Sequence, residues 1–272
     1  MLPNAADSPA KRRDRQMANF YANSDADSGQ VGGFVNYYGG NGNDLLKGTA
    51  GANSLYGGEG NDLLAGSEAT TLNTHVTGSG TANDPYKFTD TPPASGNDVL
   101  EGGSGRDGIY GFDGDDVIHG GEGDDAGVTQ GYVGVYWEGG LHGGDGDDAI
   151  YGGGGKDALF GGHDKDKLYG GADADTFFFE ELKDTSHKAK HADKIFDFDR
   201  KEGDLIDLSA IDAKANKNGD QKFKYIGDDD FTKAGQVSFK NGKVKLNTDN
   251  DSKAEAVIVV NTNKMTDDDF VL

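Results

Sequence analysis

Hydrophobic side chains between residues 39 and 178 recur with a period of nine. Eleven nonapeptides can be aligned there, three in 39–65, four in 93–128 and four in 143–178. The eighth position is Leu, Ile or Phe in ten of them, and Gly127 is the exception. In a short strand at positions seven to nine, alternation points only the middle side chain inward. The pattern therefore predicts three-residue strands with a single file of aliphatic residues as their core.

The sixth position of the repeats is Asp in ten of the eleven, with Asn53 as the exception. Glycines recur at positions one, two and four, where we expect positive φ values to turn the chain. Two nonapeptides form one coil, so each turn lies beside the turn eighteen residues later, at the ~4.8 Å spacing of paired strands. This stacking predicts that the following residues face each other: Asp44 and Asp62, Asp98 and Asp116, Asp107 and Asp125, Asp148 and Asp166, and Asp157 and Asp175.

Carboxylates stacked in this way cannot all stay ionised without a cation between them. Calcium takes about 6 to 8 oxygen ligands, and glycine-rich turns add backbone carbonyls to the Asp side chains; magnesium, which demands a strict octahedron, fits less well. We therefore predict several bound Ca²⁺ ions. The candidate ligands are Gly40, Gly42, Asp44, Gly58, Gly60, Asp62, Asp98, Gly103, Gly105, Asp107, Gly114, Asp116, Gly121, Gly123, Asp125, Gly144, Gly146, Asp148, Gly153, Gly155, Asp157, Gly162, Asp164, Asp166, Gly171, Asp173 and Asp175.

Composition and charge support a cation-dependent fold. Of the 272 residues, 34% are hydrophobic, 45 are glycine, and the net charge is −22. Residues 39–178 hold 24 acidic against 6 basic side chains, which disfavours nucleic acids as partners. The alternative is a disordered glycine-rich linker, but a linker has no reason to keep Asp and Leu two residues apart. Without calcium we do expect disorder, because so thin a core cannot offset the backbone entropy.

The segments outside the repeats are predicted separately. Residues 1–38 show no repeat, and we expect them to be mostly disordered, with a possible cap strand at 30–38; the start is Met1 or Met17. Residues 66–92 and 129–142 break the period and are interpreted as insertions. Residues 179–272 contain further β signals, including an Asn-Gly hairpin in SFKNGKVKL. The first 30 residues lack the apolar run of a signal peptide, and the chain has no cysteine.

The nonapeptides resemble the repeats of the RTX family, and the C-terminal region resembles the C-terminal module of serralysin-type metalloproteases. The residues that carry the second resemblance are TFFF at 176–179, DKIFDFDRKEGDLIDLSAIDA at 193–213, KFKYIG at 222–227, AGQVSF at 234–239 and the terminal DFVL. The resemblance implies an all-β chain, a parallel β-roll followed by a β-rich module. It also implies an uncleaved C-terminal signal read by a type I secretion apparatus, and hence secretion from a Gram-negative bacterium. The layout is similar to that of rhizobial nodulation protein O.

No catalytic motif accompanies these features. The chain lacks His-Glu-x-x-His and Gly-x-Ser-x-Gly, and His187 and His191 in HKAKH have no glutamate between them. We therefore expect a non-enzymatic, secreted calcium-binding protein that folds outside the cell and acts there by interaction, with a membrane or a polysaccharide as candidate targets. The alternatives are the non-catalytic half of a secreted hydrolase, such as a serralysin-like protease or a lipase, and a glycan-binding adhesin or matrix protein.

Overall fold

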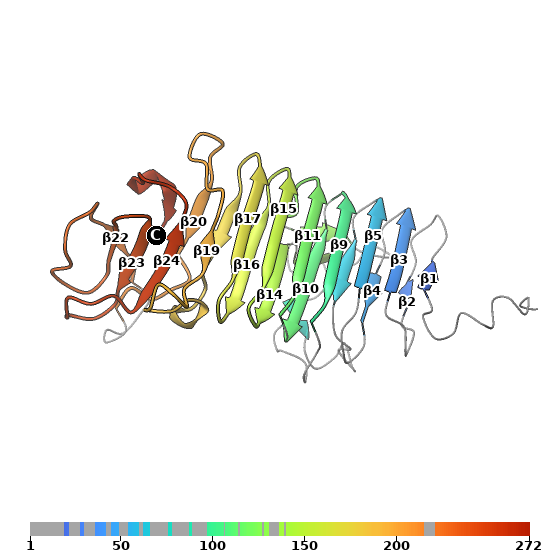
Figure 1. Ribbon diagram of the computed structural model, residues 1–272, viewed down its shortest axis with the longest axis horizontal. Helices are drawn as coiled ribbons and strands as arrows, with labels where there is room; N and C mark the ends of the chain where they lie inside the picture. The colour runs from blue at the N-terminus through green and yellow to red at the C-terminus, as the bar shows by residue number, and fades with distance from the viewer. Residues whose placement is uncertain are drawn as a thin grey trace, which may run out of the picture.

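The computed structural model describes residues 19–21, 28–29, 36–41, 45–48, 54–59, 62–65, 76–77, 87–88, 97–105, 107–113, 115–126, 128–130, 136–138, 140–214 and 221–272. The molecule is elongated, with β1 at one end and β21 to β25 near the other (Figure 1). Four predicted ligands lie outside the described residues: Gly42, Asp44, Gly60 and Gly114.

Two large sheets contain most of the described strands. The twelve-stranded sheet runs in the order β1 (Asn19–Tyr21), β3 (Asn36–Asn41), β5 (Ser54–Glu59), β9 (Val99–Ser104), β11 (Val117–Glu122), β15 (Ala149–Gly154), β17 (Lys167–Ala172), β19 (Lys194–Ile195), β24 (Ala256–Val260), β23 (Lys243–Asn247), β22 (Gln236–Phe239) and β21 (Lys224–Tyr225). The nine-stranded sheet runs in the order β2 (Ser28–Gly29), β4 (Leu45–Lys47), β6 (Leu63–Ala65), β10 (Gly108–Asp113), β14 (Gly140–Asp145), β16 (Ala158–His163), β18 (Thr176–Phe178), β20 (Leu205–Asp207) and β25 (Phe270–Val271).

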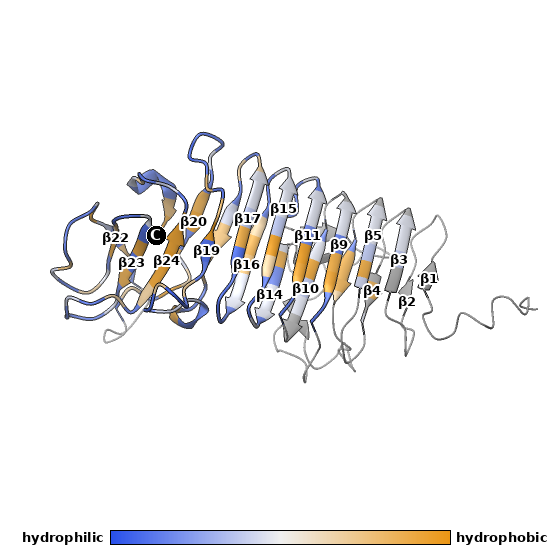
Figure 2. Cartoon of the chain, in the orientation of Figure 1, coloured by the Kyte–Doolittle hydropathy of each residue, from blue (hydrophilic) through white to orange (hydrophobic). Residues whose placement is uncertain are grey.

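The chain alternates between the two sheets and pairs in parallel with the coil before it. Ile150 pairs with Leu168, eighteen residues later, and Leu159 pairs with Phe177 in the other sheet. Side chains at the eighth position are fully buried between the sheets, among them Leu55, Leu100 and Ile118. Figure 2 shows the resulting hydrophobic band across the middle of the strands. The predicted fold, an all-β parallel β-roll, is confirmed.

Most described strands of the roll are longer than the sequence pattern predicted. Strand β9, for example, includes positions seven to nine of one repeat and positions one to three of the next. For such strands the prediction of three residues at positions seven to nine is therefore wrong. The strand continues because Gly103 at position two pairs with Gly121 despite its φ of 116°, which leaves positions four to six for the turn.

Aromatic residues at position nine form stacked rows on the outer faces of both sheets. Their ring centroids lie 4.2–4.7 Å apart and their planes are within 12° of parallel. Because each ring covers the face of its neighbour, the rows stabilise the parallel register. One row contains His119, Tyr151, Tyr169 and Phe196, and the other contains Tyr110, His142, Phe160 and Phe178.

Two antiparallel hairpins interrupt the repeats. Strands β7 (Val76–Thr77) and β8 (Lys87–Phe88) pair with each other inside 66–92, and neither joins a large sheet. Strands β12 (Val128–Gln130) and β13 (Tyr136–Glu138) do the same in the second interruption.

The predicted end of the second insertion, residue 142, is wrong. Strand β14 begins at Gly140, and Leu141 pairs with Ile109 and is fully buried. Leu141 therefore occupies the core position that the repeat alignment gave to Gly127. A buried aliphatic side chain stabilises the stack there, whereas glycine has nothing to bury.

The large sheets continue past residue 178, where the sequence analysis placed a boundary. Strand β17 pairs with β19, and β18 pairs with β20. The predicted Asn-Gly hairpin forms between β22 and β23, with φ values of 55° at Asn241 and 70° at Gly242. Two 3₁₀ turns, η2 (Leu182–Asp184) and η3 (Asp267–Asp269), complete the module. The division into 1–38, 39–178 and 179–272 stays a prediction. Among the described residues, no helix has the length and apolarity needed to span a bilayer.

Candidate metal centre

The Asp residues at position six lie at the end of each three-residue turn, directly before the next strand. All nine that the structure describes are at most 2% exposed: Asp62, Asp98, Asp107, Asp116, Asp125, Asp148, Asp157, Asp166 and Asp175. Carboxylates are rarely buried unless they are paired or bind a metal ion. Their burial throughout the described part of the roll is therefore its main chemical feature.

Backbone hydrogen bonds arrange these residues in two rows. Each Asp donates its N–H to the Oδ1 of the Asp in the next coil, at 2.7–3.1 Å. The pairings predicted for the described residues are confirmed, and the rows also bridge both insertions. The first row runs Asp98, Asp116, Asp148, Asp166, Asp193, and the second runs Asp62, Asp107, Asp125, Asp157, Asp175, Asp204.

The sequence analysis missed Asp193 and Asp204, which extend the rows beyond the glycine-rich repeats. Asp193 is fully buried, and Asp204 is 3% exposed. A signal for the first was present, since DKIF from Asp193 matches DKLY from Asp166 at positions six to nine. The absence of glycines before Asp193 concealed it. The second row ends differently from the first, because Oδ2 of Asp204 accepts the N–H of Asp199 at 2.8 Å.

The second carboxylate oxygen of most row members has no hydrogen-bond donor. This holds for Oδ2 of Asp107, Asp116, Asp148, Asp157, Asp166, Asp175 and Asp193. The position-one glycine of the same turn faces this oxygen: a Cβ on Gly102 would overlap with Oδ2 of Asp107 and would also crowd the carbonyl oxygen of Gly120. Buried acceptors without donors are costly. Both rows thus contain buried carboxylate oxygens that lack a positive partner.

The buried carboxyl groups resist ionisation when no cation is present. Burial, opposed by the backbone N–H donor, raises the pKa from 3.8 to about 8 at Asp107, Asp116, Asp148 and Asp175. Neighbouring carboxylates raise these pKa values further, as Asp166 does for Asp148. In the tightly coupled pair Asp166 and Asp193, burial followed by like charges raises the pKa of the first, and burial is also the main cause at the second. A bound cation would reverse both effects.

The donor set fits a hard cation such as Ca²⁺. The atoms of the rows without a donor are carboxylate oxygens, as calcium requires, and the turns supply backbone carbonyls. Within the described residues, no three carboxylates of a row come within 4.8 Å of one another, so each site would need carbonyls from the turns to complete its ligands. The Asp side chains supply the charge, and the glycine backbones supply the remaining oxygens.

The glycines of the turns have two different structural roles. Position two has φ values of 97–120° and position four of 117–144°, so both need the positive φ that was predicted. Asp164 and Asp173 take position four with φ values of 79° and 80°. The prediction of positive φ at position one is wrong. Glycine is needed there for a different reason: a Cβ would overlap with Oδ2 of the Asp in the same turn. The predicted glycine carbonyl ligands at positions two and four stay a prediction.

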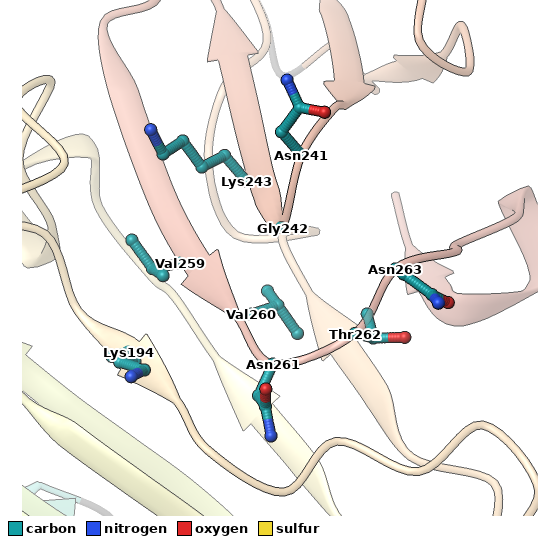
Figure 3. A pocket seen from close by; sticks show the side chains of 9 residues that line it. All are labelled: Lys194, Asn241, Gly242, Lys243, Val259, Val260, Asn261, Thr262 and Asn263. Atoms are coloured by element: carbon teal, nitrogen blue, oxygen red, sulfur yellow. The ribbon is translucent and has the colours of Figure 1, made fainter.

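The C-terminal module also contains an open groove (Figure 3). Lys194, Lys243, Asn261 and Thr262 are among its lining residues. The ammonium of Lys194 lies 4.1 Å from the ring centroid of Phe196, and the amide of Asn261 donates to the Phe196 carbonyl at 2.7 Å. In Figure 3 the two lysine side chains do not converge on a common point. These groups hold the fold together, and the Asp rows are the stronger candidate site.

Comparison with known proteins agrees with this chemistry. Residues 38–69, 94–126 and 141–179 match the family model of the RTX calcium-binding nonapeptide repeat, four copies in length. The chain therefore carries RTX calcium-binding repeats on a parallel β-roll. The matched model describes a calcium-binding repeat and no catalytic activity, and the prediction that the chain is not an enzyme stays a prediction.

The solution structure of the AlgE6R3 subunit from the Azotobacter vinelandii mannuronan C5-epimerase is similar at 25% identity and a TM-score of 0.35, over 58% of this chain and 80% of that chain. No curated protein sequence matches the chain. The resemblance of residues 179–272 to the serralysin module and the nodulation protein O layout stay predictions.

Proposed function

We propose that this chain is a secreted calcium-binding protein whose roll folds when Ca²⁺ enters the two Asp rows outside the cell. The observation that carries the proposal is the two continuous rows of buried Asp residues, seven of which have a second carboxylate oxygen without a donor. The Oδ2 atoms of the rows, together with glycine carbonyls of the turns, would hold the ions. Bound calcium would supply the positive charge that lets the carboxylates stay ionised while buried.

Calcium-dependent folding gives the export step a direction. Extracellular calcium modules bind at about 10⁻⁴–10⁻³ M, far above cytosolic calcium, so the chain would stay unfolded inside the cell. Folding outside removes the unfolded form and opposes return. The extracellular partner, a membrane or a polysaccharide, stays a prediction, as do the hydrolase-half and adhesin alternatives.

The proposed export signal is the C-terminus, and in the folded chain these residues are packed. Phe270 is 8% exposed and lies in β25, which pairs with β20. Arg200 donates from Nε to both carboxylate oxygens of Asp269 at 2.7 Å, and from Nη2 to Oγ1 of Thr266 at 2.7 Å. A signal held in this way is accessible to an export apparatus before folding and is covered afterwards.

Deletion of residues 269–272 should abolish secretion from a Gram-negative host that carries a type I apparatus. The purified truncated chain should still gain β signal with calcium, because the Asp rows lie elsewhere. The matched control is Arg200→Gln, which breaks the same ion pair but keeps the terminal residues and should be secreted like the wild type. Normal secretion of the truncated chain would contradict the proposed signal.

A further inference from the structure

A second kind of acidic site lies outside the rows, in the loop that joins β23 to β24 at the end of the molecule far from β1 (Figure 1). One carboxylate oxygen each from Asp249, Asp251 and Glu255 lies within 4.8 Å of the other two. Because Ca–O bonds are ~2.3–2.6 Å long, a single ion can contact three oxygens with this spread. The loop belongs to neither Asp row and to none of the residues matched by the repeat model.

A buried amide below the loop independently indicates a missing ligand. Asn247 is fully buried, and its Nδ2 donates to the carbonyl oxygens of Asp251 and Lys253 at 2.8 Å each. Its Oδ1 has no partner. The amide group is thus directed at the loop through Nδ2, and one of the two carbonyl oxygens that it contacts, that of Lys253, could also contact a cation. A half-turn about the Cβ–Cγ bond would exchange Nδ2 for Oδ1 and add a further oxygen ligand.

The spacing of these residues is that of a known calcium loop. Asn247, Asp249, Asp251, Lys253 and Glu255 are alternate residues, and they correspond to positions one, three, five, seven and nine of the EF-hand loop, where position seven contributes its backbone carbonyl. We propose that residues 247–255 form a calcium site that is separate from the nonapeptide rows, with Oδ1 of Asn247, the three carboxylates and the Lys253 carbonyl as ligands.

The carboxylates are already positioned by the backbone of the loop. Glu255 accepts the N–H of Thr248 at 2.7 Å, and Asp249 accepts the N–H of Asp251 at 2.7 Å. Each of these side chains keeps a second oxygen for an ion. The twelfth position, where an EF-hand has its bidentate glutamate, is the buried Ile258. The site therefore has fewer ligands than an EF-hand, and we expect it to bind in the ~10⁻⁴–10⁻³ M range of extracellular modules.

The test is a count of bound ions by native mass spectrometry of the full chain at saturating calcium. The double variant Asp249→Asn/Asp251→Asn should hold one calcium fewer than the wild type. The matched control Asp229→Asn/Asp230→Asn changes two exposed aspartates of another loop and should hold the wild-type number. The calcium midpoint of the far-UV circular dichroism signal should stay within about twofold of wild type in both, because neither changes the rows.

An unchanged ion count in the double variant would overturn this site. If that variant does not fold, the single change Asp251→Asn, at an exposed side chain, should show the same loss of one ion. A wild-type chain that binds no calcium at all would contradict the proposed function, whereas a variant that binds as many ions as the wild type contradicts only this loop.

Discussion

Replacement of Gly153 by alanine should strongly destabilise the calcium-loaded roll. Gly153 is at position two with a φ of 119°, a conformation that L-residues rarely adopt. A Cβ there would also overlap with the carbonyl oxygen of Gly121 in the preceding coil, and a backbone atom inside a sheet cannot move away cheaply. We expect a loss of at least ~3 kcal/mol, a large part of the stability of a typical domain. Chemical denaturation at saturating calcium measures it.

The control for this change is the next residue in the same strand. Gly154 is at position three, where a Cβ would lie 3.3 Å from Oε2 of Glu122, the mobile end of an exposed side chain. Other repeats have Glu122 and His163 at this position. Gly154→Ala should therefore change the stability by less than ~0.5 kcal/mol. Equal stability of the two variants would show that the coils are not stacked as closely as described.

Acidification should restore β structure to the calcium-free chain. The carboxyl groups of Asp107, Asp116, Asp148 and Asp175 have a pKa of about 8 in the folded chain and an ordinary value of 3.8. Because the folded pKa is the higher one, the folded state binds more protons between these values. Its stability is fully present below pH 3.8 and is lost as the pH rises towards 8. Each group contributes up to about 1.4 kcal/mol per pH unit.

The measurement is far-UV circular dichroism of resin-stripped protein between about pH 8 and pH 5, because chelators lose calcium affinity in acid. The β signal should rise as the pH falls. In matched samples with calcium, the midpoint calcium concentration should instead increase on acidification, because protons compete for the same carboxylates. A calcium-free chain that gains no β signal by about pH 5 would show that the rows are not what prevents its folding.

The repeat pattern predicted the periodic part of the structure because each repeat encodes the same few constraints. Leu100, Ile150 and Leu168 are fully buried where position eight required it. Asp98 and Asp116 face each other, since a coil of two nonapeptides leaves no other register. These features depend on local spacing, which the sequence states directly.

The features that were missed depend on contacts between distant residues. Leu141 is a core residue only because the hairpin β12–β13 returns the chain to the roll, and spacing from Asp125 gives no sign of this. Position one needs glycine because a Cβ there would overlap with an Asp carboxylate and, in repeats such as that of Gly102, with a carbonyl oxygen of the next coil. The φ of this glycine is not positive, so its conformation gives no sign of the requirement. Asp193 joins a row 27 residues after Asp166, and residues 172–192 directly before it contain no glycine.

The most direct test of the account is a far-UV circular dichroism titration of the chelated protein at about pH 7.5, with calcium and in parallel with magnesium. The two rows of buried carboxylates predict a disordered spectrum without metal ions. A cooperative gain of β signal should follow at submillimolar to millimolar calcium, with no comparable gain from magnesium. A spectrum that is already fully folded in chelator would contradict the account, because the rows would then be stable without any cation.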